Sequence, residues 1–489
     1  MNDITAIFAF LKYCLGYKRN MSRMIAGMDW QELYSFASKQ ALLGLSFEGI
    51  ERLGKEYSEE LRLNPIGREL LMTWMGKAQQ IRRQNMKVNA VASKLYSMLR
   101  EDGLRCCILK GQGNALIYPN AYSRNPGDID VWVNASRERI MEYAQKKFEL
   151  GDDIRLQHLE TSLDGVPVEL HFFPCSMNNP IYHARLQKWF RRNADLQCSH
   201  IVGLPDGAGD IAIPTTAFNV VYQLTHLYHH FFDEGIGMRQ IIDYYYVVCD
   251  FYKVYQNSSK ITPSLFFDKA SCTRQFESEL SLHSLASLFP IKEGSTSHPD
   301  PLSMVFTPPS VPPFPGDRNL RGEGGNRPTR CSEPLRSKDG GPSKVSPDCA
   351  GWDRLSIEGD NSAGSTTVVT SYASTALDVA QRELKYLGLW KFAGAVMYVL
   401  KEVLGLSEDK MIVPVDEKRG RLLLAEILDG GNFGRHFSKY GGFTHQSMGK
   451  KYFLKIWRNM HFVRYYPAEA LCEPLFRTWH FFWRLKYKK

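Results

Sequence analysis

The spacing of hydrophobic residues changes twice along the chain, and these changes restrict the fold more than any other feature of the sequence. Over roughly the first hundred residues, apolar side chains recur every three or four positions, which predicts helices. The pattern then changes to short β-type runs at residues 104–109, 129–133, 157–163 and 166–172. Helical spacing returns after Pro214, continues to about Tyr255 and resumes near Leu377. We therefore expect an α+β fold, in which a small mixed β-sheet is flanked by helical N-terminal and C-terminal regions.

The length of 489 residues exceeds what one hydrophobic core usually organises. Residues from about 293 to 375 are rich in Pro, Gly, Ser and Thr, and such a segment cannot bury enough apolar surface to fold alone. We interpret them as the disordered part of a low-complexity insertion. The expected organisation is a helical region at 1–100, a β-containing core at 101–175, a second helical region at 176–255, the insertion at 256–375 and a helical region at 376–489.

The composition favours a cytoplasmic protein without integral membrane association. The chain is 44% hydrophobic and 12% aromatic, and no apolar run reaches the roughly 18 residues that span a bilayer. The apolar stretch from Ile7 to Leu15 is interrupted by Lys12 and follows no basic region, so a secretion signal is disfavoured. Ten cysteines without CxxC pairs or metal-ligand spacing fit reduced thiols.

The net charge of +9 is concentrated in part at the C-terminus, from Lys450 to Lys489, where Lys and Arg alternate with Trp, Phe and Tyr. Three interpretations are open for this tail. It can form packed helices whose basic groups reach solvent, contact nucleic acid or another anionic surface, or dock on a membrane.

Two aspartates at the start of the second β-type run, one just before it and one inside it, carry the strongest chemical signal. Side chains alternate along a strand, so Asp128 and Asp130 project from one face while Ile129 and Val131 enter the core. Neighbouring carboxylates repel each other unless a cation lies between them, and oxygen ligands suit Mg²⁺ or Mn²⁺. On the 166–172 run the same alternation leaves Glu169 opposite the buried face, so that a third carboxylate can join the pair.

Asp164 and Gly165 separate the last two β-type runs by two residues, which is a strong signal for a type I′ hairpin turn. Upstream, Gly111 ends one strand and begins an expected helix, where backbone N–H groups can receive a phosphate beside the charge of Lys110. This turn lacks the Walker pattern, and Gly111-x-Gly113 alone is weak evidence for a dinucleotide fold. Its significance depends on the acidic strands that follow it.

The order of strand, glycine turn, helix, Asp-x-Asp strand and acidic strand resembles the nucleotidyltransferase fold of the DNA polymerase β superfamily. More closely, LKGQGNALIYPNAYSRNPGDIDVWV, VPVELHF and GIGMRQIIDYY resemble the bacterial family of uncharacterised nucleotidyltransferases. We extend this resemblance over nearly the whole chain except about 256–375, with the catalytic core at 101–175. The matching positions are the paired aspartates Asp128 and Asp130, the third acid Glu169, the turn residues Lys110 and Gly111, and the upstream arginine Arg124.

The resemblance implies a metal-dependent enzyme that moves a nucleoside monophosphate from an NTP to an acceptor hydroxyl. Asp128, Asp130 and Glu169 would hold Mg²⁺ or Mn²⁺, while Lys110, Gly111 and Arg124 would face phosphates. The acceptor is left open between a small molecule, a protein and a nucleic acid.

Two rival functions are open. Gln112 stands where the superfamily often has a hydroxyl that touches the nucleotide phosphate, which favours a non-catalytic nucleotide-binding or regulatory module. The basic aromatic tail favours a transferase directed at nucleic acid.

Several single residues have two interpretations each. Arg239 can pair with Asp243 one helical turn away, or reach the cleft and hold a phosphate or the acceptor. His226 and His230 lie four residues apart, which permits zinc binding but fits helix packing or substrate contact better without a third ligand. His171 shares the face of Glu169 and is either a partner of the metal site or a strand-edge residue.

Overall fold

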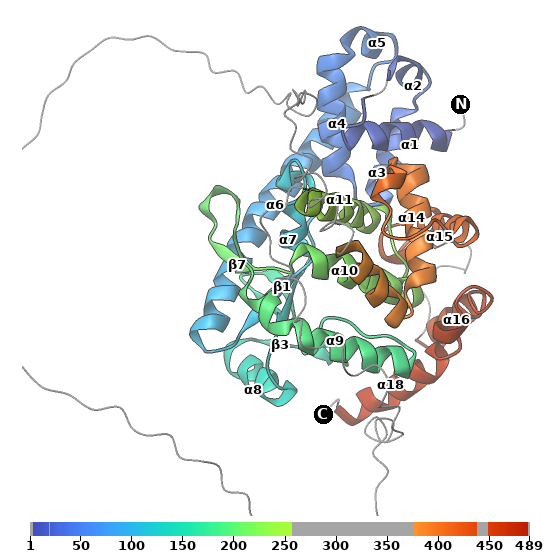
Figure 1. Ribbon diagram of the computed structural model, residues 1–489. Helices are drawn as coiled ribbons and strands as arrows, with labels where there is room; N and C mark the ends of the chain where they lie inside the picture. Colours follow the sequence, from blue (N-terminus) through green and yellow to red (C-terminus); the bar gives the residue numbers. More distant parts are fainter. Residues whose placement is uncertain (1–2, 19, 257–375, 438–447, 488–489) are drawn as a thin grey trace, which may run out of the picture. The chain divides into compact units, whose positions relative to one another are not determined.

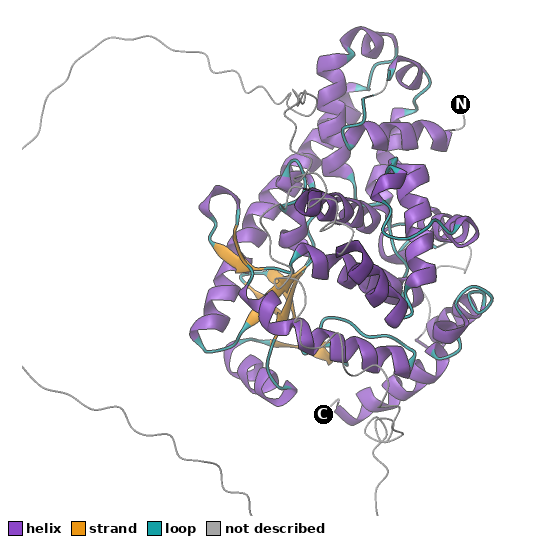
Figure 2. Ribbon diagram, viewed as in Figure 1, coloured by secondary structure: helices purple, strands orange, loops and turns teal. Residues whose placement is uncertain are grey.

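The computed structural model describes residues 3–18, 20–256, 376–437 and 448–487. These residues belong to one compact unit, formed by residues 1–269 and 362–489. Figures 1 and 2 show that most of them are helical and that the strands are gathered in one place. The expected α+β class is confirmed, whereas the disordered insertion expected from about residue 293 lies outside the described residues.

The first hundred residues form helices, as their spacing predicts. These are α1 (Asp3–Cys14), α2 (Ser22–Ala26), α3 (Trp30–Lys39), α4 (Leu43–Glu56), α5 (Ser58–Leu63) and α6 (Arg68–Glu101). The carboxylate of Asp29 caps α3 by accepting hydrogen bonds from two backbone N–H groups of its first turn. The long helix α6 buries Val88, Leu95 and Leu99 in the core that lies against the sheet.

Five strands form one mixed sheet in the order β1-β2-β5-β4-β3. Their bounds are β1 Cys106–Leu109, β2 Ile129–Val133, β3 Leu150–Ile154, β4 His158–Leu163 and β5 Val166–His171. The pair β2–β5 is parallel and the other pairs are antiparallel. The predicted hairpin is confirmed, since Leu163 pairs with Val166 and both turn residues, Asp164 and Gly165, have positive φ. The strand β3 was not predicted, because its Gly and Asp residues have low β-propensity.

Both faces of the sheet are buried. Ile129, Val131 and Val133 enter the core shared with α6 and α8 (Arg137–Lys147), as the alternation predicts. On the opposite face Trp132 stacks on Phe218 of α10 (Thr216–Asp233), with ring centroids 6.3 Å apart. The sequence did not predict this second burial. Because Asp130 shares a face with Trp132, the carboxylate is buried in the fold rather than left on an open strand.

The region 176–255 contains three long helices and, between the first two, a pair of short strands that the sequence did not predict. After α9 (Pro180–Ser199), the strands β6 (Ile201–Gly203) and β7 (Asp210–Ala212) form a small hairpin before α10 and α11 (Met238–Gln256). These strands have three residues each, which is too short for a two-residue periodicity to be recognised. The short helix α7 (Gly111–Ala115) confirms the helix expected to begin at Gly111, whereas α8 beside the sheet was not predicted.

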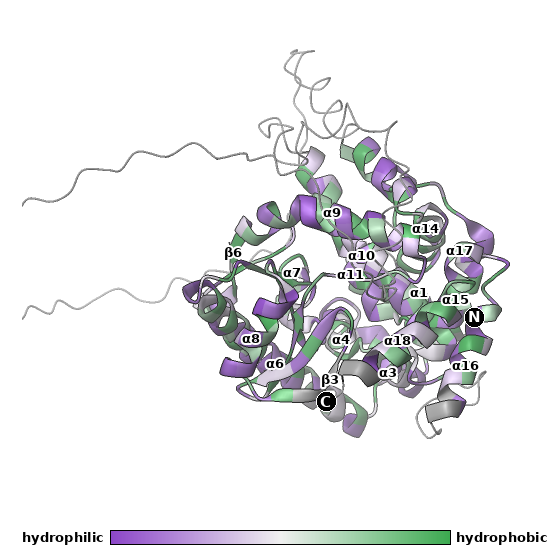
Figure 3. Ribbon diagram, turned by 90° about the horizontal axis from the view of Figure 1, so that it is seen from below, coloured by the Kyte–Doolittle hydropathy of each residue, from purple (hydrophilic) through white to green (hydrophobic). Residues whose placement is uncertain are grey.

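The C-terminal region is helical wherever it is described. Residues 376–386 are helical, followed by α14 (Trp390–Leu404), α15 (Glu417–Gly430), α16 (Met448–Met460), α17 (Pro467–Ala470) and α18 (Glu473–Tyr487). Helix α15 ends at the predicted break at Gly430. Hydropathy changes repeatedly along α6 and α9 in Figure 3, as expected of helices that bury one face. Within the described ranges, no helix combines the length and the apolar character that crossing a membrane requires.

Basic residues of the C-terminal tail are partly engaged in packing. Arg458 of α16 is 1% exposed and lies 3.2 Å from Glu426, while Lys455 and Arg477 each lie 3.1 Å from Asp233. These contacts agree with the interpretation of packed helices. Apolar side chains of the same tail, including Phe453, Trp457 and Leu475, remain exposed.

A buried glutamate links the tail to the start of α9 and should make stability depend on pH. Burial raises the pKa of Glu469 to about 7, against the opposing effect of hydrogen bonds from the backbone N–H groups of Asn178 and Asn179. The folded state therefore binds this proton more tightly than the unfolded state. The stabilisation that comes from binding this proton is complete below pH 4.5 and is lost as the pH rises to 7. The total loss in the free energy of unfolding is about 3 kcal/mol.

Urea unfolding at pH 5 and pH 8 should therefore show a smaller loss of stability in Glu469→Gln than in the parent. The exposed residue Glu417 supplies the control, because Glu417→Gln should leave the difference between the two pH values unchanged. An identical loss in the parent and in Glu469→Gln would show that this carboxyl group has no part in the pH dependence.

Candidate active site

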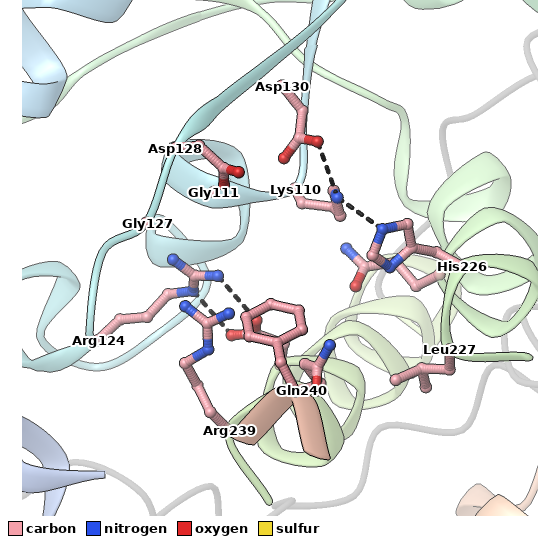
Figure 4. A pocket seen from close by; sticks show the side chains of 13 residues that line it. Lys110, Gly111, Arg124, Gly127, Asp128, Asp130, His226, Leu227, Arg239 and Gln240 are labelled. Atoms are coloured by element: carbon pink, nitrogen blue, oxygen red, sulfur yellow. Dashed lines mark hydrogen bonds and ion pairs between the residues drawn. The ribbon is translucent and has the colours of Figure 1, made fainter. Parts of the chain in front are cut away.

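A cleft beside the start of β2 gathers most of the side chains that the sequence singled out. About 470 Å³ of space in and around it is not filled by atoms, open solvent included. Figure 4 shows acidic and basic groups facing one another across it. Its lining residues are Lys110, Gly111, Arg124, Gly127, Asp128, Asp130, Gln223, His226, Leu227, Arg239, Gln240, Asp243 and Phe433.

The two aspartates lie on the same side of the cleft but in different environments. Asp130 is inside β2 and is 5% exposed, whereas Asp128 precedes the strand and is exposed. Repulsion from Asp130 raises the pKa of Asp128 to about 6. For Asp130, the cations Lys110 and His171 outweigh burial and lower the pKa below its usual range. The charge of Asp130 is thus neutralised by its neighbours, whereas the charged form of Asp128 is destabilised by repulsion from Asp130.

Lys110 occupies the centre of the cleft and neutralises Asp130. Its Nζ lies 3.0 Å from Asp130 Oδ1 and 2.6 Å from His226 Nε2 (Figure 4). Burial alone would lower the pKa of Lys110, but the nearby carboxylates raise it above its usual value, so the amine stays charged. Burial and the charge of Lys110 keep the pKa of His226 well below its usual value. The ring is therefore neutral, and its Nε2 can accept a hydrogen bond from the amine of Lys110.

Lys110 itself has φ +52°, a left-handed conformation that is costly for a residue with a Cβ atom, and Gly111 follows with φ +38°. This tight turn between β1 and α7 is the predicted lysine-glycine turn, and it directs both residues to the cleft. Gln112 is 3% exposed and hydrogen-bonds through Nε2 to Asn89 of α6. The residue that replaces the superfamily's hydroxyl therefore packs into the fold and does not line the cleft.

Glu169 lies beside Asp130, because the parallel pairing of β2 and β5 places the two residues in register. It does not line the cleft. His171 Nε2 lies 3.0 Å from Asp130 Oδ1 and 3.1 Å from Glu169 Oε2, and these acids raise the pKa of His171 to about 9 against the opposing effect of burial. The three predicted carboxylates are thus neighbours, with an imidazole joining two of them. His171 is a partner of the carboxylate cluster rather than a strand-edge residue.

Two arginines lie side by side at the other end of the cleft (Figure 4). Arg124 donates from Nε and Nη2 to the two oxygens of Asp243, at 2.8 and 2.9 Å, and both side chains are buried. Tyr118 donates to the same carboxylate at 2.7 Å. Arg239 donates from Nη1 to the backbone oxygen of Asn125, and within the described residues its Nε has no hydrogen-bond partner. Arg239 thus reaches the cleft, while Asp243 holds Arg124.

Some residues of the site were not singled out from the sequence. His158 on β4 lies opposite His171 on β5, and its Nδ1 is 3.2 Å from Glu169 Oε2. The predicted two-residue turn determines this pairing, so counting back along the hairpin would have found His158. Phe433, which follows α15 and lies against Arg239, carries no such signal because it is nearly 200 residues away in sequence.

Of the comparisons with known proteins, the one with family models gives a match. The family model described as "Uncharacterised nucleotidyltransferase" matches residues 26–261, which include the sheet, the cleft residues of β1, β2, α10 and α11, and Glu169. The match does not extend to residues 376–489, over which we had also extended the resemblance. No curated protein and no solved structure matches the chain. Residues 26–261 therefore belong to the family of uncharacterised nucleotidyltransferases.

Proposed function

We propose that this cleft catalyses the metal-dependent transfer of a nucleoside monophosphate from an NTP to an acceptor hydroxyl. The observation that supports it most is the gathering of two carboxylates, Asp128 and Asp130, with the cations Lys110, Arg124 and Arg239 around one cleft. A nucleoside triphosphate carries several negative charges, and the reaction adds charge to the departing pyrophosphate. Cations and metal-binding acids in one cleft are the groups that this chemistry requires.

The donor set fits a hard divalent cation such as Mg²⁺ or Mn²⁺. Asp128 and Asp130 offer carboxylate oxygens at the cleft, and Glu169 stands next to Asp130 in the sheet. The raised pKa of Asp128 reflects repulsion within this set, which a bound cation would relieve. When bound, divalent ions neutralise the phosphates and favour ionisation of the acceptor hydroxyl.

The three basic side chains of the cleft would each contribute differently to binding the phosphates. Arg239 is the best phosphate contact, because its guanidinium lines the cleft and its Nε lacks a partner within the described residues. Arg124 is fixed by Asp243 and supplies positive charge from a set position. Lys110 balances Asp130 in the unliganded protein and lies where it can also face a phosphate.

The proposal is tested by incubating the purified protein with each labelled NTP, Mg²⁺ or Mn²⁺, and a lysate, and identifying by mass what acquires a nucleotide. We expect transfer to one class of acceptor, small molecule, protein or nucleic acid, that depends on the metal. We also expect one NTP to stabilise the protein against heat when the metal is present. Metal-dependent stabilisation without transfer would favour the non-catalytic nucleotide-binding module, and the absence of both would refute the assignment of the cleft.

A further inference from the structure

Two buried histidines and a glutamate form a compact cluster on the hairpin of β4 and β5. Each of His158, Glu169 and His171 offers one ligand atom, and these atoms lie within 4.8 Å of one another. Glu169 Oε2 is 3.2 Å from His158 Nδ1 and 3.1 Å from His171 Nε2. Two ligands bound tetrahedrally at about 2.1 Å from one zinc ion would be about 3.4 Å apart. The separations to Glu169 are already close to that value.

His158 is buried without the hydrogen bonds that a buried imidazole normally makes. It is 2% exposed, and neither of its ring nitrogens has a hydrogen-bond partner within the described residues. Its approach to Glu169 is short but lacks hydrogen-bond geometry. Burying an unpaired polar nitrogen costs free energy, so native proteins rarely leave one without a ligand or partner. A metal ion that accepts the ring's lone pair accounts for both the burial and the orientation.

The chemistry of the cluster differs from that of the Asp128–Asp130 pair. Mg²⁺ favours oxygen ligands, and the aspartate pair offers oxygen alone. The hairpin cluster offers two imidazole nitrogens and one carboxylate, a set that suits Zn²⁺ and neighbouring first-row transition metals. The two histidines are held opposite each other by the strand pairing, with ring centroids 4.9 Å apart.

We propose that His158, Glu169 and His171 bind one divalent transition-metal ion of the zinc type, and that His171 releases its Nε2 proton to solvent when the ion binds. None of the three side chains lines the cleft, so the site is distinct from it even though Glu169 belongs to both proposals. His171 also contacts Asp130, so the bound ion would lie close to this carboxylate of the cleft. The inference holds whether or not the cleft transfers nucleotides.

The test is a titration of chelator-treated, full-length protein with Zn²⁺ by calorimetry and with Co²⁺ by visible absorption. We expect one ion per chain, retained in a large excess of Mg²⁺, and a Co²⁺ spectrum typical of nitrogen and oxygen ligands. His158→Phe and Glu169→Gln should each lower the Zn²⁺ affinity by at least about 100-fold, since even residues that only support a metal ligand can cost that much. Less than one ion per chain, or displacement by Mg²⁺, would overturn the proposal.

Three control variants distinguish binding at this cluster from unfolding and from binding elsewhere in the chain. His158→Phe replaces an unpartnered ring by an apolar ring, so the metal-free variant should melt cooperatively like the parent. Asp128→Asn should keep Zn²⁺ binding while losing any stabilisation by NTP and Mg²⁺, which distinguishes a failure of this proposal from a failure of the proposed function. His226 and His230, whose Nε2 atoms are 3.0 Å apart, are the competing pair. Loss of Zn²⁺ binding in His226→Ala, with binding kept in His158→Phe, would contradict the assignment.

Discussion

Replacing Asp128 with Asn should lower the rate of nucleotidyl transfer by roughly 10³-fold while leaving the unliganded protein at least as stable as the parent. The activity is lost because the amide keeps the shape of the side chain but removes the charge that would bind the cation. Stability is kept because the negative charge of Asp128 is repelled by Asp130 in the folded state, as its raised pKa shows. The measurements are transfer of labelled nucleotide and urea unfolding without metal.

Asp130→Asn should lose activity to a similar degree but should also destabilise the protein, by about 3 kcal/mol. Asp130 Oδ1 lies 3.0 Å from Lys110 Nζ and 3.0 Å from His171 Nε2. In the variant, both cations would lose this anionic partner inside the fold. Repulsion between grouped acids, taken alone, would predict that removal of either aspartate costs little stability. The ion pairs of Asp130 make its removal costly in stability, whereas the removal of Asp128 is not costly. Equal stability of the two variants would contradict the charge pairing described for the cleft.

Replacing Asp243 with Ala should be among the most destabilising single changes in the described part of the chain, at about 4 kcal/mol. The carboxylate accepts two hydrogen bonds from Arg124 and one from Tyr118. Both members of the ion pair are buried, with 4% and 6% of their side chains exposed. Removing the acid leaves the guanidinium charged, desolvated and without its main partner. Urea unfolding of the parent and the variant measures the loss.

The double variant Arg124→Met with Asp243→Ala should recover part of that loss, because it removes the stranded charge as well as its partner. The exposed pair of Arg62 and Glu59 is the matched control, since Arg62→Ala should hardly shift the unfolding midpoint. A double variant less stable than Asp243→Ala alone would mean that Arg124 stabilises the fold through contacts other than this carboxylate.

The ion pair of Arg124 and Asp243 should also make the stability of the fold depend on pH in the acidic range. Burial would raise the pKa of Asp243, but Arg124 outweighs it and lowers the pKa below the ordinary value. The stabilising effect is therefore present above the ordinary aspartate pKa and is lost as the pH falls below it, which is opposite in sign to the effect of Glu469. Stability should pass through a maximum, and Asp243→Ala should flatten its acidic side.

The sequence by itself determined the local elements of the core. Alternating apolar residues defined β2, and the Asp164-Gly165 turn fixed the register of β4 and β5. That register also determines that His158 faces His171. Both results depend on short-range geometry, in which the period of two along a strand and a two-residue turn leave few alternatives.

Only the tertiary structure decided how the chemical groups are paired. Arg124 lines the cleft, where it was expected to face phosphate, and it is held there by Asp243, which lies 119 residues later on α11. Lys110 also lines the cleft, and its amine lies between Asp130 and His226 of α10. Local spacing shows which side of an element is apolar and does not show which distant element covers the other side. Charge pairing depends on that packing, because a buried cation needs an anion within hydrogen-bonding distance wherever the chain supplies one.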